Sequence, residues 1–318
     1  MAGKPEAEIK IVRYNASFFE TWNRFNQTAV NGLFLFDRNY LEYHQHRFQD
    51  HSLLFYLADE LVAIFPMNEE LTVAVSHRGL TFGGLVVSLK VRIHVYLRAF
   101  EALLTYLRTY GFKKINIKPV PFIFHQHLTL HDQYAFSQHR FELTTRSLSS
   151  CLDLTNDLNF TKGRKWSLVK ARQTNLFVTA SQDYEAFMGL VKQVLESKYQ
   201  VSPTHTAAEI ASLAQKFPEN IQLLTIYHAS ELIGGTVIYL SPAVVHLQYI
   251  ATSAMGKKLH ALDLLMEYLI RKFSGQKKYL NFGISPGPDQ FGLNTGLIQN
   301  KESYGARSLP QDVYTLTL

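Results

Sequence analysis

Cysteine, charged residues and long apolar runs are all scarce in this sequence, and each shortage excludes a class of protein. The 318 residues include one cysteine, Cys151, so an internal disulfide and a thiolate-rich zinc site are both excluded. Cys151 lies in the apolar segment 148–152, where a small core residue is expected rather than a nucleophile. The longest apolar run, 53–58, is far below the roughly 20 residues that span a bilayer. We therefore expect a globular protein without a membrane helix.

Apolar residues make up 47% of the chain, which is enough to bury two cores of ordinary size. Charged residues make up 18%, which is too few for an extended disordered segment. Residues 1–8 carry charge without an apolar stretch behind them, so we expect no secretory signal and infer a cytoplasmic protein. The formal net charge of +6 favours anionic partners such as a nucleotide-bearing cofactor, a nucleotide sugar or RNA. Cations concentrate in two places: at Lys162, Arg164, Lys165, Lys170 and Arg172, and at Lys257 and Lys258.

A pattern in the first half of the chain returns in the second. Residues 56–63 read YLADELVA and residues 227–234 read YHASELIG, 171 residues further on. Each block predicts two strands joined by a polar turn, namely 53–56 with 62–67, and 223–227 with 233–240. Both halves are therefore expected to contain a β-hairpin.

After each hairpin the sequence predicts a short apolar strand, an amphipathic helix and a strand that begins with a lysine pair. The helices contain residues 101–107 and 263–269, and the last strands are 113–117 and 277–282. The same elements in the same order favour a duplicated unit, although such patterns also recur by chance in α/β proteins. A polar segment at 140–145 predicts the boundary, which gives one domain at 1–146 and another at 147–318.

Three stretches of the second half resemble a known family. They are the basic segment 164–172 (RKWSLVKAR), the segment 246–253 (HLQYIATS) with the helix around 261–265, and the segment 296–305 (GLIQNKESYG). The last is similar to a signature of Gly-Leu, then Lys, then an aromatic residue and Gly. With the order of elements, these stretches resemble the FemAB-like tandem GNAT family of peptidyl and aminoacyl transferases, especially its soluble acetyltransferase-like branch.

The resemblance implies an α/β fold with a mixed sheet, made of two tandem GNAT-like acyl-CoA N-acyltransferase domains. The first domain is expected on the acceptor side and the second on the donor and catalytic side. The implied reaction transfers an acyl group, from acetyl-CoA or another acyl-CoA, to an amino sugar or surface-polysaccharide precursor. Two alternatives stay open: an aminoacyl-tRNA-dependent peptidyl or aminoacyl transferase, and a non-catalytic tandem fold that binds a glycan precursor or a partner enzyme.

In GNAT folds the pantetheine arm of the donor lies between two strands that splay apart. The splaying strand here is 246–251, so the backbones of Ile250 and Ala251 are expected to contact an acyl-CoA. The pyrophosphate is expected at the next helix start, where free N–H groups favour an anion. The residues assigned to that turn are Gly256, Lys257, Lys258, His260 and Ala261. His260 departs from the usual turn of Arg or Gln followed by two small residues, and this departure favours the non-catalytic alternative.

Amine acylation requires a base for the attacking amine and an acid for the leaving group. His246 is the candidate base, with a structural strand histidine as the alternative, and strand alternation predicts that Gln248 shares its face. Tyr304 resembles the general-acid tyrosine of many GNAT enzymes, with a core tyrosine as the rival interpretation. Further substrate contacts are expected from Gln248, Asn281, Ser285 and Lys301.

In the first half, the glycine-rich segment 76–84 permits close backbone approach to a ligand. Its residues Ser76, His77, Gly83 and Gly84 are predicted to bind the acceptor, although turn glycines explain the pattern equally well. Histidines at 44 and 46, and at 125, 127 and 131, invite a metal interpretation. No Asp, Glu or Cys completes a ligand set at a recognised spacing, so we expect no metal site.

Overall fold

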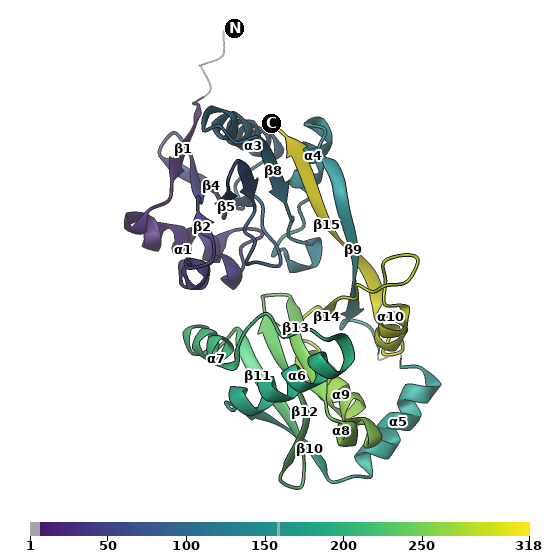
Figure 1. Cartoon of the computed structure of the whole chain (residues 1–318). Coiled ribbons are helices and arrows are strands. Elements are labelled where there is room, and N and C mark those ends of the chain that lie inside the picture. Colours follow the sequence, from purple (N-terminus) through teal and green to yellow (C-terminus); the bar gives the residue numbers. More distant parts are fainter. Residues whose placement is uncertain (1–6, 158–159) are drawn as a thin grey trace. The chain divides into compact units, whose positions relative to one another are not determined.

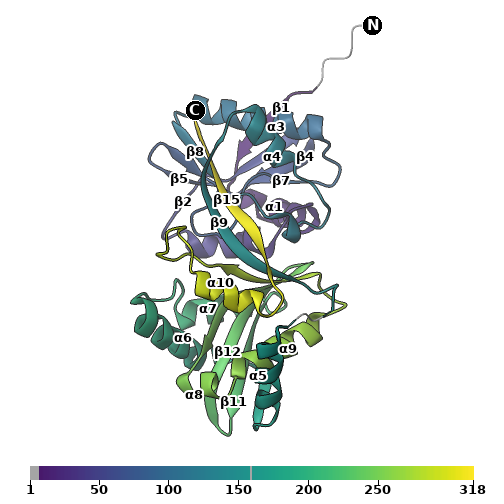
Figure 2. The same ribbon diagram turned by 90° about the vertical axis from the view of Figure 1, so that its right-hand side faces the viewer.

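The computed structural model describes residues 7–157 and 160–318 and divides into two compact units. Unit 1 contains the residues up to Arg146 together with Pro310–Leu318, and unit 2 is Ser147–Leu309. Helices and strands are mixed throughout both units, so the predicted α/β class is confirmed. Figures 1 and 2 show the chain in two views; each unit is described by itself.

Unit 1 begins with a strand and ends its own stretch of sequence with a helix before β9 (Glu142–Asp153). Its elements in chain order are β1 (Ile9–Arg13), α1 (Phe19–Thr28), α2 (Arg38–Leu41), β2 (Gln49–Asp50), β3 (Leu53–Leu57), β4 (Glu60–Phe65), β5 (Asn68–Glu70), β6 (Val73–Val75), β7 (Val86–Val87), α3 (Ile93–Thr109), β8 (Lys114–Ile117) and α4 (His131–Gln138). Strands β1-β3-β4-β7 form an antiparallel sheet, and β6 pairs in parallel with β8.

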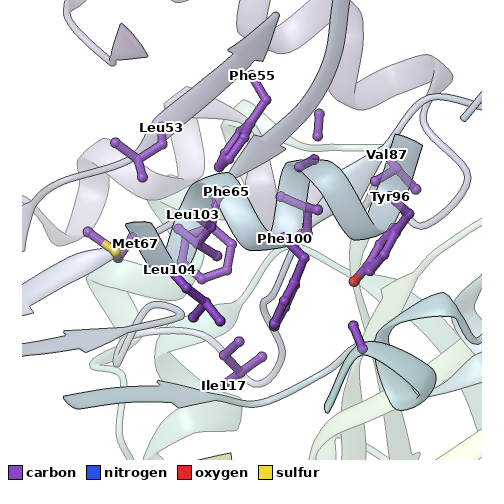
Figure 3. Close-up of a cluster of buried hydrophobic side chains, with 14 of the residues drawn as sticks. Leu53, Phe55, Phe65, Met67, Val87, Tyr96, Phe100, Leu103, Leu104 and Ile117 are labelled. Carbon is purple, nitrogen blue, oxygen red and sulfur yellow. The ribbon is translucent and has the colours of Figure 1, made fainter. Parts of the chain in front are cut away.

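The core of unit 1 forms because apolar residues recur on one face of α3 at helical spacing. Phe100, Leu103 and Leu104 on that face are at most 1% exposed. They pack against Leu53 and Phe65, from the faces of β3 and β4 that point toward the helix (Figure 3). Burial of this apolar surface is the main stabilising contribution to the unit.

Unit 2 carries a longer central sheet. Its elements are α5 (Lys162–Arg172), β10 (Leu176–Ser181), α6 (Tyr184–Tyr199), α7 (Ala207–Lys216), β11 (Ile221–His228), β12 (Glu231–Leu240), β13 (Val244–Thr252), α8 (Ala254–Lys258), α9 (Ala261–Phe273), β14 (Tyr279–Ile284) and α10 (Thr295–Glu302). The strand order is β10-β11-β12-β13-β14-β9, where β13 and β14 run parallel. Figure 2 shows α6 and α7 on one face of these strands, and α5 and α9 on the other.

The two predicted hairpins are present, and they match in detail. β3–β4 and β11–β12 both pair antiparallel, with register shifts after Phe55 and after Ile226. The two turns also match, because Ala58 and Ala229, 171 residues apart, both adopt a left-handed backbone with φ of 53° and 54°. Shared irregularities of this kind support a duplication, because chance similarity of hairpins does not reproduce the position of a bulge and a strained turn.

The sheet of each unit is completed by a strand that is distant in sequence from the strand it pairs with. In unit 2, Ser149–Asp153 of β9 (Glu142–Asp153) pairs antiparallel with β14. In unit 1, Tyr314–Thr317 of β15 (Arg307–Thr317) pairs antiparallel with β8. The predicted second domain, 147–318, therefore differs from unit 2 at its end, since Pro310–Leu318 belongs to unit 1. Sequence patterns could not show this, because strand pairing is decided by contacts distant in sequence.

Candidate functional site

The central feature of unit 2 is the point where two parallel strands part. β13 and β14 pair at Val244–Tyr279, Val245–Leu280 and His246–Asn281, and the parallel ladder ends there. Beyond His246, β13 continues along β12 as far as Thr252. Within the described part of the chain, this stretch of β13 pairs with no strand on its other side. Its backbone groups on that side are available to an extended ligand.

His246 and Asn281, the last residues of the ladder, are joined to each other by side-chain hydrogen bonds. The Asn281 Oδ1 atom accepts from the Gly283 N–H at 2.9 Å, which fixes the orientation of the amide. His246 Nδ1 lies 2.8 Å from the same oxygen and must therefore be the protonated ring nitrogen. Asn281 Nδ2 donates to Ser149 Oγ at 2.9 Å. The network thus assigns the lone pair of the imidazole to Nε2.

Burial lowers the pKa of His246 from its usual 6.5 to about 4, and the nearby Lys301 ammonium contributes in the same direction. The imidazole is consequently neutral at pH 7. Because the folded-state pKa lies below the unfolded value, this group favours folding above about pH 6.5, and that contribution is lost as the pH falls toward 4. A neutral, weakly basic nitrogen at the end of the ladder is suited to accept a hydrogen bond.

Lys301 and Ser285 are also near this point, but they are bonded to the protein itself. Lys301 Nζ donates to Ser285 Oγ at 2.7 Å, to the Gly283 carbonyl at 2.8 Å and to the Ile284 carbonyl at 3.3 Å. These bonds use all three donors of the ammonium, and burial lowers its pKa to about 8. Lys301 therefore shapes the turn after β14. The geometry does not support the predicted role of Lys301 in binding a substrate carboxylate or phosphate.

A β-bulge at Gln248 brings a further residue, Tyr249, onto the face of His246. Tyr239 lies opposite His246 and Val237 lies opposite Tyr249, with Gln248 unmatched between them. Val237 and Tyr239 share a face, so His246 and Tyr249 do too, and the expected alternation fails at Gln248. Sequence reasoning missed Tyr249, since a bulge carries no signal in the apolar pattern.

Tyr249 is held by a histidine from the loop that follows α6. The Tyr249 hydroxyl lies 2.7 Å from His205 Nδ1 and accepts the His205 backbone N–H at 3.2 Å. Burial raises the pKa of Tyr249, so the phenol stays protonated. The contact fastens the loop to β13 on the face that carries His246.

No protein-family model matches this sequence. No match was found among curated proteins. Solved structures, in contrast, match over nearly the whole chain. FemX aligns with a TM-score of 0.69 and 10% identity over 97% of both chains. A second match is the C-terminal domain of a putative lysylphosphatidylglycerol synthetase from Agrobacterium fabrum. It aligns with a TM-score of 0.61 and 10% identity over 95% of this chain and 92% of that chain. A tandem GNAT protein from the clavulanic acid biosynthesis pathway aligns with a TM-score of 0.50 and 13% identity over 98% of both chains.

This chain has a tandem GNAT fold. The fold predicted from the FemAB-like resemblance is thereby confirmed. At identities of 10–13% the comparisons speak for the fold alone.

Tyr304, the predicted general acid, lies on the other face of the second GNAT sheet from His246. It packs with Val245 and Leu247, whose side chains point away from the His246 face because neighbours on a strand alternate. The phenol is 1% exposed and donates to Asp263 Oδ1 at 3.3 Å. Burial and this carboxylate raise its pKa far above the usual value. The expected acid–base pair of His246 and Tyr304 is therefore not assembled, and Tyr304 is a core residue.

The predicted donor turn 256–261 contains the end of one helix and the start of another. The helix after β13 is α8, which begins at Ala254 and is capped by Ser253, whose Oγ accepts the Gly256 N–H at 3.1 Å. Gly256 is buried there, and a β-carbon on it would lie 2.3 Å from the Ile233 carbonyl oxygen. Close packing thus accounts for this glycine without a ligand. α9 begins at Ala261, after His260 in a left-handed conformation with φ of 55°.

Gly256→Ala is expected to lower the free energy of unfolding by about 2 kcal/mol, because the new methyl group meets backbone that cannot yield. Gly163→Ala on α5 is the matched control. A β-carbon at Gly163 meets no heavy atom within 4 Å, so alanine should stabilise by up to about 1 kcal/mol. Denaturant unfolding of both variants measures the difference. A Gly256→Ala protein of unchanged stability would show that the glycine is not required by packing.

The first GNAT unit preserves the asparagine of this site but lacks its histidine. Asn116 Oδ1 accepts from the Thr315 hydroxyl at 2.8 Å, as Asn281 pairs with Ser149 in unit 2. The parallel partner of Asn116 is Val75, in the place that His246 occupies beside Asn281. An apolar side chain cannot exchange a proton, so the chemistry predicted for the second unit has no counterpart here.

The glycine-rich segment 76–84 of unit 1 is folded against its own backbone. A β-carbon on Gly83 would lie 2.0 Å from the Ser76 carbonyl oxygen, and Gly84 has a φ of 101°. Ser76 Oγ accepts the Lys118 N–H at 2.9 Å, and buried His77 has a φ of 70°. These contacts explain why the glycines are needed. Acceptor binding by this segment stays a prediction.

Metal and thiol chemistry receive no support from the described residues. These residues contain no group of three or more His, Cys, Asp or Glu side chains placed to hold a metal ion. Burial raises the pKa of Cys151 to about 12, so its thiol is not ionised at neutral pH. None of the helices described is long and apolar enough to cross a membrane.

Proposed function

We propose that this chain is an N-acyltransferase whose reaction centre is the parting of β13 and β14 in unit 2. The observation that carries the proposal is the end of the parallel ladder at His246 and Asn281. It gives an unpaired strand edge for an extended donor and a neutral imidazole at the point where that edge begins. In this assignment, Ile250 and Ala251 offer backbone groups to the pantetheine arm of an acyl-CoA.

An acetyl-CoA or other acyl-CoA supplies a thioester carbonyl when it is bound. The amine of the acceptor attacks that carbon, the carbon–sulfur bond breaks to release a thiolate, and the proton that the nitrogen loses as the amide forms passes through water to that thiolate. His246 Nε2 accepts a hydrogen bond from the amine and thereby aims its lone pair at the carbonyl. A base with a pKa of about 4 does not hold an ammonium proton at pH 7, so the acceptor gives that proton to water before it reacts.

The acceptor in this proposal is an amino sugar or a surface-polysaccharide precursor. Gln248 in the bulge is the polar group assigned to it, while Asn281 and Ser285, both buried and hydrogen-bonded within the protein, hold the end of β14 beside it. Lys301 holds Ser285 and the turn in place. For unit 1 by itself, Ser76, His77, Gly83 and Gly84 keep their predicted role in acceptor binding.

The test is the pH dependence of acyl transfer from acetyl-CoA to a panel of amino sugars. Because the lowered pKa of His246 leaves the lone pair in place down to about pH 4, kcat/KM should show no acid limb near 6.5. It should rise with pH as the free amine form of the acceptor increases.

Lys301→Met removes a cation beside His246 and should shift any acid limb of the pH profile to higher pH, whereas Lys258→Met should not. An acid limb near pH 6.5 in the wild type would contradict this assignment, and absence of acetyl-CoA binding by calorimetry would contradict the donor.

An aminoacyl-tRNA donor is the second candidate. The lysines on the outer side of α5 favour it, because Lys162, Lys165 and Lys170 are exposed and make no ion pair among the described residues. If RNA is the donor, activity should fall steeply between low and physiological salt, as phosphate contacts are lost. An activity that depends on acetyl-CoA and is insensitive to salt would exclude it.

A further inference from the structure

The outer surface of α5 combines an exposed aromatic ring with lysines that have no acidic partner among the residues the structure describes. Trp166 is 57% exposed, whereas the other tryptophan, Trp22, is 0% exposed. Lys170 Nζ lies 4.5 Å from the centre of the Trp166 ring. Lys162 and Lys165 lie on the same helix, and eight residues of helix from Lys162 to Lys170 span about 12 Å. An exposed tryptophan beside unpaired cations is a feature that structural packing does not explain.

The arginines of the same helix are used differently. Arg164 donates to Asp263 at 3.2 Å and lies over the Tyr304 ring at 4.4 Å. Arg172 forms an ion pair with Glu267. These two arginines attach α5 to α9 on its inner side. Only the lysines remain for a partner, so the positive surface is the outer side of α5.

His260 joins this surface to the second group of cations. Its ring lies 5.8 Å from the Trp166 ring at an interplanar angle of 76°. Lys257 and Lys258, exposed at the end of α8, come directly before it in the chain. The residue that departs from the usual GNAT turn is therefore in contact with the exposed tryptophan. Trp166 and the lysines of α5 thus form one surface with His260 and the lysines at the end of α8.

Trp166 also lines a groove whose walls carry several amide and hydroxyl groups. The groove has a volume of about 560 Å³ between α5 and α10. Ser167 and Trp166 from α5, and Gln299 and Asn300 from α10, are among the residues that line it. Amide and hydroxyl groups of this kind form hydrogen bonds to the edge of a base or to a ribose.

We propose that this surface, the Trp166 surface, binds the adenosine-phosphate end of the acyl-CoA donor. Trp166 stacks on the adenine, the α5 lysines and Lys257 bind the phosphates, and the groove takes the ribose. The inference rests on the acyl-CoA donor of the proposed function. A single nucleotide is favoured because the free lysines of α5 lie within about 12 Å of one another, a span that fits a few phosphates on one ligand.

Tryptophan fluorescence tests the Trp166 surface directly. Trp166 is exposed and Trp22 is buried, so a ligand that stacks on Trp166 quenches the long-wavelength part of the emission. Adenosine 3′,5′-bisphosphate and coenzyme A should both quench the wild type, and the quenching should disappear in Trp166→Phe. Lys170→Met should weaken binding by about threefold to tenfold and reduce its salt dependence. Lys272→Met is the matched control, because Lys272 Nζ makes a similar contact, 5.8 Å from the centre of the Tyr268 ring. The affinity of this variant for both ligands should equal that of the wild type.

Three outcomes would overturn the inference. They are no quenching by adenosine 3′,5′-bisphosphate, equal loss of affinity in Lys170→Met and Lys272→Met, and tighter binding of a 12-nucleotide single-stranded RNA by more than tenfold. Acyl transfer is measured separately in the same variants. Transfer that depends on His246 without quenching would overturn the Trp166 surface alone. Quenching without transfer to any amine would leave the nucleotide site standing and remove the proposed function.

Discussion

Replacement of His246 by alanine is expected to lower kcat for acyl transfer by at least about 100-fold without loss of folding. The imidazole is the group at the end of the β13–β14 ladder whose nitrogen can accept a hydrogen bond from the amine, and Asn281 fixes which nitrogen does so. Steady-state kinetics at saturating donor, with circular dichroism of the same samples, measures both quantities. KM for the donor should change little, because the backbone of β13 holds the donor.

His228→Ala is the control for this experiment. His228 is the last residue of β11 in the same sheet and pairs with Leu176 of β10 and Glu231 of β12, away from the His246–Asn281 pair. Asn281→Leu should reproduce much of the His246 effect, since Nδ1 loses the acceptor that fixes the tautomer. Full activity in His246→Ala would show that this histidine is structural, and the reaction centre would have to be placed elsewhere.

Deletion of Pro310–Leu318 is expected to unfold unit 1 rather than unit 2. The segment pairs with β8 from Tyr314 to Thr317, and the Tyr314 ring stacks on Phe136 with ring centres 4.6 Å apart. The loss of these ladder hydrogen bonds and of the buried area should cost about 4 kcal/mol or more. The segment is last in the sequence, yet its loss should act on the first unit.

Hydrogen exchange resolved by residue measures this effect. Amides of β8 should lose protection in the truncated protein, while amides of β12 should keep it. Thr317→Ala is the control, because its side chain is exposed at the end of the strand and it should leave both regions protected. Unfolding that begins in unit 2 would contradict the pairing of β15 with β8.

Much of the candidate site could be read from local pattern. His246, Asn281 and Ser285 were predicted as polar residues on, or at the end of, apolar strands, and the fold brings these strands together. Such predictions succeed because parallel strands end at one edge of a sheet, whatever the rest of the fold does. Ser149, which holds Asn281, could not be found in this way, because it comes from a strand 132 residues away.

Tyr304, Gly256 and His260 show where prediction from the local sequence pattern fails. Tyr304 has the same sequence context in either role, and only the packing of α9 and α10 on the far face of the sheet makes it a core residue. Gly256 fits a phosphate turn equally well, until the Ile233 carbonyl is found 2.3 Å from where its β-carbon would be. His260 was an unexplained departure, and its contact with Trp166 gives it a role in the inferred nucleotide surface.

By itself, the sequence determined the hairpins, the amphipathic helices and the duplication, because each depends on the spacing of apolar residues within a few turns of chain. The tertiary structure decided three further points: the bulge at Gln248, the face on which Tyr304 lies, and the strands that complete each sheet. The bulge depends on how β12 pairs with β13, the face of Tyr304 depends on helix packing, and the strands that complete each sheet pair across more than 100 residues of sequence. No periodicity within a segment records such a choice, because any apolar edge strand satisfies the same local pattern.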